Sequence, residues 1–198
     1  TVSQTKLLGT IITDQLRWNE NTKYIVRKAN QKMNLLHKFS KFTRNKSHIM
    51  HIFKSQVRSV LEYCSTVWHS SLTRSDSKDI ERIQKAAVKL IMGEKYEGYS
   101  KSLKFLNLDS LHKRREKSAL KFAKKSVMNE SFANFFPKQP KGHIMRTRYS
   151  DRYKVNKAQT ERYRRSAVPY LQRLLNDDHQ RQKKILKTLL QVNNDVFL

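Results

Sequence analysis

Residues 21–42 read NTKYIVRKANQKMNLLHKFSKF, and this stretch decides the fold class. Its apolar side chains Ile25, Ala29, Leu36 and Phe39 recur at the spacing of a helix. Lysines and an arginine occupy many of the positions between them. The pattern predicts an amphipathic helix with a basic outer face.

Helical spacing returns along the rest of the chain. It predicts helices at residues 47–63, 76–92, 99–105, 109–128, 160–176 and 178–192, and an interruption of the 160–176 helix at Pro169. We expect Ser47, either Asp76 or Ser77, and Asp109 to act as N-caps, and Gly93 to end the helix before it. Basic side chains are expected on the exposed face of the 109–128 helix: Lys113, Arg114, Arg115, Lys117, Lys121, Lys124 and Lys125.

The N-terminal segment has a different character. Residues 6–12 read KLLGTII, which is short, apolar and β-branched at its end, and Gly9 marks a bend. The whole chain has only 4 Gly and 3 Pro, too few for the tight turns of a β-sandwich or barrel. We therefore predict a mainly α fold: a helical bundle with a short N-terminal β strand or hairpin and a C-terminal helical tail.

Composition suggests one main domain with an appendage, because 198 residues support one good core. Residues 1–18 precede the helical domain, which we place at 19–129. Residues 130–157 lose the helical period and contain two prolines and a glycine, so we expect an irregular linker there. Residues 158–198 form the helical tail. The chain does not begin with Met, and we expect it to be a fragment of a longer protein.

Charge is the strongest compositional signal. The chain has 42 Lys plus Arg against 16 Asp plus Glu, a formal net charge of +26. Such an excess repels itself on folding, and a polyanionic partner such as a phosphate backbone would neutralise it. No apolar stretch approaches the roughly 20 residues of a membrane-spanning helix, and no secretory signal is visible. We therefore expect no membrane partner.

The single cysteine, Cys64, follows the apolar residues of VLEYC. It has no internal disulfide partner, and we expect a buried, inert thiol. A reducing compartment, nuclear or cytoplasmic, follows from this expectation.

No complete catalytic constellation is present in the sequence. No phosphate-binding glycine-rich loop is present among the four glycines, Gly9, Gly93, Gly98 and Gly142, because none is followed by the Lys-Ser/Thr pair that such a loop needs. His48 and His51 are spaced i and i+3 but lack a third ligand, so a helix face is favoured over a metal site. Asp177 and Asp178 resemble a helix N-cap more than a metal-binding pair. We predict neither a catalytic residue nor a metal ligand in this chain.

Arginine alternates with tyrosine in residues 145–154 and again in residues 161–165. Guanidinium groups pair with phosphates, and tyrosine rings stack on unpaired bases. The alternative is that the tyrosines pack on the helical core while the arginines are merely solvated. Both interpretations stay open for this segment.

Several motifs follow one another along nearly the whole chain: KLLGTIIT at residues 6–13 with Leu16 and Trp18, SQVRSVLEYCSTVW at residues 55–68, and IERIQKAA at residues 80–87. In this order they resemble the reverse transcriptases of Jockey-like non-LTR retrotransposons. The first is similar to the "KFLG" turn and "L.W..HI" of that family, the second to "S.IRPVLEYASPVW", and the third to "LERVQRRAAR". Residues 99–115 and 160–169 resemble its later segments.

This resemblance implies the end of the polymerase: the last palm strand with a primer-grip-like turn, a helical thumb, and the tail. The family's catalytic aspartates lie upstream in a Tyr-x-Asp-Asp motif that this sequence lacks. Two metal-holding carboxylates are needed to activate a primer hydroxyl, so we expect no polymerisation by this chain alone. No cofactor is expected in this chain, because Mg²⁺ would belong to the missing palm.

The leading hypothesis is therefore a nucleic-acid-binding fragment that grips a template–primer duplex, RNA and DNA, by its phosphates. The upstream palm of the same polyprotein is the expected protein partner. The alternative is a domesticated or decayed remnant that acts as a helical protein-interaction module. The predicted nucleic-acid-binding residues are Lys6, Gly9, Arg27, Lys28, Lys32, Arg146, Arg148, Arg162, Arg164 and Arg165.

Overall fold

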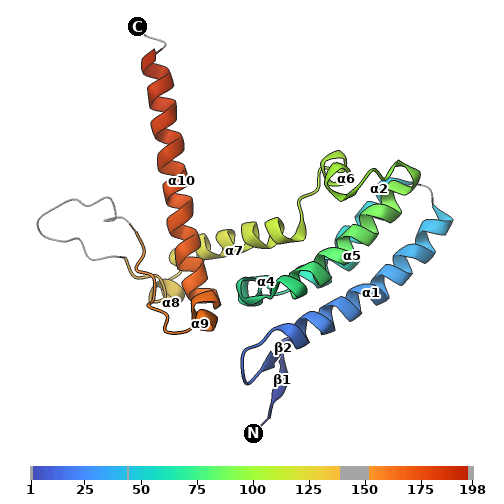
Figure 1. Cartoon of the computed structure of the whole chain (residues 1–198), viewed down its shortest axis with the longest axis horizontal. Coiled ribbons are helices and arrows are strands. Elements are labelled where there is room, and N and C mark those ends of the chain that lie inside the picture. Colours follow the sequence, from blue (N-terminus) through green and yellow to red (C-terminus); the bar gives the residue numbers. More distant parts are fainter. Residues whose placement is uncertain (1, 44, 139–151, 196–198) are drawn as a thin grey trace, which may run out of the picture. The chain divides into compact units, whose positions relative to one another are not determined.

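The computed structural model describes residues 2–43, 45–138 and 152–195, the last nine of these by their backbone only. These residues are mainly helical, with a small two-stranded sheet near the N-terminus (Figure 1). The expected fold class is confirmed. The chain divides into two compact units, Thr1–Ser118 and Ala119–Leu198.

The N-terminal strand is half of a hairpin. β1 (Gln4–Leu7) pairs antiparallel with β2 (Thr10–Thr13), and Leu7 lies opposite Thr10. Between the strands, Leu8 and Gly9 have φ of 46° and 82°. Two positive φ angles are what a two-residue type I′ turn requires, and they match the twist of the strands. The backbone N–H of Ile11 donates to the side chain of Asn21 at 3.1 Å, which ties β2 to the first helix.

The first unit is a set of helices around one core. In chain order they are α1 (Asn19–Phe42), α2 (Lys46–Ile52), a π-helical segment (Phe53–Arg58), α3 (Ser59–Glu62), α4 (Ser65–Trp68), α5 (Arg74–Met92), α6 (Tyr99–Phe105) and α7 (Leu111–Val127). Short 3-10 turns lie at His69–Ser71 and Gly93–Lys95. α1 and α5 pack along each other (Figure 1). Leu36, Phe53, Leu61, Trp68 and Ile80 are fully buried in this core.

The helix starts differ from the predicted N-caps. Asn45, not Ser47, caps α2, because its side chain accepts from the N–H of Ser47 at 3.0 Å. Thr73 caps α5 and forms a reciprocal capping box with Asp76. Gly93 ends α5 as expected, with φ of 59°.

The start of α7 is also held by a residue other than Asp109. The Glu81 carboxylate accepts from the backbone N–H groups of Leu111 and His112 at 3.1 and 3.3 Å, and the Tyr99 hydroxyl donates to it. Asp109 instead pairs with Lys113 and Lys117.

Two burial predictions are wrong. Cys64 is exposed, because its left-handed backbone (φ 53°) forms the turn between α3 and α4 and directs it outward. Arg115 is fully buried rather than exposed on α7. Its guanidinium lies 5.8 Å from the centre of the Trp68 ring and donates from Nε to Nδ1 of His69 at 3.3 Å.

The second unit contains the end of α7, α8 (Glu130–Ala133), α9 (Glu161–Arg165) and α10 (Ala167–Asp195). Ala119 and Ala123 of α7 pack in one core with Leu171, Leu174 and Leu175. This packing explains why the boundary between the two units lies within α7, at Ser118 and Ala119. The sequence places the end of the helical domain later, at residue 129.

α10 corrects two further expectations. Pro169 lies in its first turn, where a missing N–H breaks no helical hydrogen bond, so the helix is not interrupted there. Asp177 and Asp178 lie inside the helix and do not cap it, and Asp178 pairs with Lys124 at 2.8 Å.

Candidate nucleic-acid interface

The hairpin turn is held close to α3. The hydroxyl of Tyr63 donates to the carbonyl oxygen of Leu8 at 2.8 Å. A Cβ atom added to Gly9 would meet the Tyr63 ring at 3.4 Å, and its φ of 82° is already unfavourable for other residues. Gly9 thus allows the turn to lie against this ring.

Two lysines converge on one aromatic ring beside this turn. The ammonium of Lys6, on β1, lies 4.9 Å from the centre of the Tyr24 ring, and that of Lys28, one helical turn further along α1, lies 5.2 Å from it. Hydrogen bonding from Lys6 and then Lys28 lowers the pKa of Tyr24, because both cations stabilise its phenolate. The hairpin and α1 therefore contribute one cation each to the same place.

These two cations are not neutralised within the described part of the chain. No carboxylate there lies within ion-pair distance of Lys6, Lys28 or Lys32. Neighbouring Lys23, by contrast, pairs with Glu20 at 2.8 Å. Two like charges over one ring repel each other, so an anion bound between them would be stabilised.

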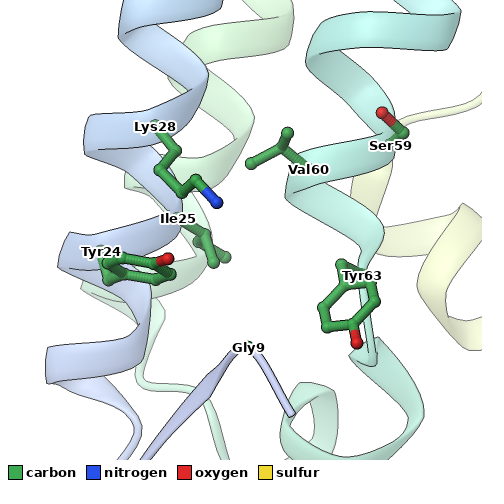
Figure 2. Close-up of a pocket in the computed structure, with 7 residues that line it drawn as sticks. All are labelled: Gly9, Tyr24, Ile25, Lys28, Ser59, Val60 and Tyr63. Atoms are coloured by element: carbon green, nitrogen blue, oxygen red, sulfur yellow. The ribbon is translucent and has the colours of Figure 1, made fainter. Parts of the chain in front are cut away.

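A pocket of about 330 Å³ opens beside Tyr24. Figure 2 shows Tyr24 and Lys28 on the α1 side, Val60 and Tyr63 on the opposite side, and the Lys28 ammonium directed into the space between them. Its lining comes from the hairpin turn, α1, α3 and the residue that follows α3: Gly9, Tyr24, Ile25, Lys28, Ser59, Val60 and Tyr63. We call this the turn pocket.

The three predicted residues of α1 do not share one face. Lys28 and Lys32 are four residues apart, so they lie on the same side of the helix as Tyr24. Arg27 is one residue before Lys28 and points about 100° away from it. All three side chains are exposed. Lys28 and Lys32 extend the cationic surface begun by Lys6, and Arg27, three residues after Tyr24, lies on the other side of that ring.

The predicted tail residues belong to the second unit. Arg162, Arg164 and Arg165 are exposed on α9. The guanidinium of Arg164 is already engaged by both oxygens of Glu161, at 2.7 and 3.2 Å, and this pairing lowers the pKa of that carboxyl. Arg146 and Arg148 lie outside the described residues.

The two described tyrosines of the Arg–Tyr segments, residues 145–154 and 161–165, differ in their surroundings. One is packed in the core, and the other is exposed as base stacking would require. Tyr153 packs edge-on against the buried Phe136, with ring centres 6.5 Å apart, so it belongs to the core. Tyr163 is 44% exposed, and its hydroxyl accepts from Asn156 at 3.2 Å.

Sequence reasoning missed both tyrosines of the turn pocket. Tyr24 could have been found, because it lies four residues before Lys28 on the same helix face. Tyr63 could not, because its contact with Leu8 joins residues 55 positions apart and leaves no local pattern.

Comparison with known proteins found no matching protein family, no matching curated protein and no matching solved structure. The described residues contain no group of three His, Cys, Asp or Glu side chains placed to hold a metal ion. None of the helices in the described ranges combines the length and apolar character that crossing a membrane requires.

Proposed function

We propose that this chain binds a nucleic-acid duplex, RNA paired with DNA, through its phosphates, as the primer-grip and thumb-like part of a Jockey-like reverse transcriptase. The observation that carries the proposal is the pair of ammonium groups of Lys6 and Lys28 over the Tyr24 ring, with no carboxylate partner among the described residues. In this proposal bond making belongs to another part of the parent protein.

The surrounding surface supports a partner that is an extended anion. Lys32 continues the cationic face of α1 by one more turn, and the chain carries a net charge of +26. Phosphate contacts position a protein on a duplex without reading its bases. Binding should therefore be sequence-tolerant.

The test is equilibrium binding of the full chain to an RNA–DNA duplex over a range of salt concentrations. Phosphate contacts release counterions, so affinity should fall steeply between about 50 and 200 mM salt, with little change when the duplex sequence is scrambled. Affinity that is independent of salt would contradict the proposal.

A second candidate, a helical protein-interaction module, is favoured by one observation. The hairpin exposes apolar side chains: Leu7 is 57% exposed, Leu8 83%, and the following Leu16 56%. Among the residues that the structure describes, β1 pairs with β2 alone, so its outer edge can pair with another strand. A monomeric, folded chain with no affinity for any duplex would favour this second candidate.

A further inference from the structure

We propose that the turn pocket receives one unpaired nucleobase of a strand whose phosphates are held by Lys6 and Lys28. The inference rests on the proposed function and adds to it the class of ligand that the pocket takes.

The size of the pocket suits a single ring system. Ligand pockets span about 300–1,000 Å³, and this one, about 330 Å³, is at the small end of that range. A paired base has its edge covered by its partner and its faces covered by the stack. Only a base that has left the pair can enter so small a space.

The walls suit a flat, weakly polar body. Ile25 is buried and Val60 half-buried, and the rings of Tyr24 and Tyr63 lie on opposite sides of the space (Figure 2). Stacking of a base on an aromatic ring depends little on base identity, because every base has a π face. The pocket therefore predicts recognition of a base as such rather than of a sequence.

The polar groups that line the pocket favour a ligand that carries a negative charge close to its flat ring. The hydroxyl protons of Tyr63 and Ser59 are donated to the carbonyl oxygens of Leu8 and Ser55, at 2.8 and 2.5 Å. The side-chain donors of the lining that remain to face a ligand are the Lys28 ammonium and the Tyr24 hydroxyl (Figure 2). An apolar protein side chain in this space would desolvate that cation without pairing it, whereas a nucleotide supplies both a ring and a phosphate.

The experiment compares two RNA–DNA duplexes that each carry one unpaired 3′ nucleotide, one with its base and the other abasic. The two have the same number of phosphates, so their affinities differ only through the base. We expect the full chain to bind the base-bearing duplex about tenfold more tightly, as expected for one base stacked on an aromatic ring. An unpaired 2-aminopurine should also lose fluorescence on binding.

Val60→Phe should fill the pocket and remove this tenfold preference, so that the chain binds the two duplexes with equal affinity. Ser59→Leu, at an exposed lining position, gives the same test if circular dichroism shows that the first variant is misfolded. Lys28→Gln should weaken binding to both duplexes.

Equal affinity of the unmodified chain for both duplexes, with a steep salt dependence retained, would overturn the pocket assignment and leave the proposed function standing. If Val60→Phe and Ser59→Leu both kept the preference for the base-bearing duplex, the pocket assignment would also be overturned. Binding to neither duplex would overturn both proposals.

Discussion

At the scale of single residues, half-buried polar groups join the helices of the first unit. Glu81 is the best example, because its carboxylate accepts from the hydroxyl of Tyr99 and from two backbone N–H groups at the start of α7. It thereby connects α5 to α6 and α7. Burial and this hydrogen bond raise the pKa of Tyr99 above its ordinary value.

Glu81→Gln should lower the free energy of unfolding by about 1–3 kcal/mol, because an amide supplies only one acceptor oxygen in place of two and loses the charge. Urea denaturation measures the change. Glu94→Gln, at an exposed position of the turn after α5, is the matched control and should change stability by less than about 0.5 kcal/mol. Equal effects of the two substitutions would contradict this role.

His69 makes stability depend on pH. Burial, with Arg115 and His112 nearby, lowers its pKa from 6.5 to about 3. Between these values the unfolded chain binds a proton that the folded chain does not, so stability is complete above about pH 6.5 and falls as the pH drops toward 3. The loss should approach about 1.4 kcal/mol per pH unit.

Urea midpoints at pH 4–7 would measure this effect. His69→Gln should flatten the dependence in that range relative to the unmodified chain, whereas His37→Gln, at an exposed position of α1, should not. A slope that is the same in both variants would assign the pH dependence to other groups.

At the scale of elements, the hydrophobic period predicted most helices, but it could not identify their caps. A cap depends on which nearby side chain reaches the free N–H groups, and Asn45 and Thr73 do so from outside the periodic segments. Periodicity also treats every basic residue as a surface residue. It therefore misplaced Arg115, whose burial depends on Trp68 and His69 from another helix and turn.

The hairpin turn offers a test at this scale. Leu8 adopts a left-handed backbone conformation, φ 46°, which costs most residues about 1–2 kcal/mol but suits asparagine. Leu8→Asn should therefore raise the free energy of unfolding by about 1 kcal/mol while removing the most exposed apolar side chain of the hairpin.

Leu7→Asn is the matched control for that substitution. It makes the same side-chain change one position earlier, on strand β1, where asparagine is unfavourable. In thermal unfolding, Leu8→Asn should have a higher Tm than the unmodified chain, and Leu7→Asn should have a lower one. The reverse order would contradict the turn assignment.

At the scale of the whole molecule, composition predicted an excess of positive charge but not where that charge is unpaired. Some lysines of the basic helices are paired internally, as Lys113 and Lys117 are with Asp109. Lys6 and Lys28 are 22 positions apart in the sequence and meet only because the hairpin folds back beside α1. Sequence reasoning named both residues but could not join them through Tyr24.

The most direct test of the central claim is the slope of log Kd against log salt concentration for an RNA–DNA duplex. The double variant Lys6→Gln/Lys28→Gln should have a slope smaller by about 2, because each substitution leaves one phosphate without its lysine. Lys23→Gln/Lys101→Gln removes the same charge from lysines already paired with Glu20 and Glu97, and should keep the slope of the unmodified chain. Equal slopes for the two double variants would contradict the claim that Lys6 and Lys28 hold phosphates.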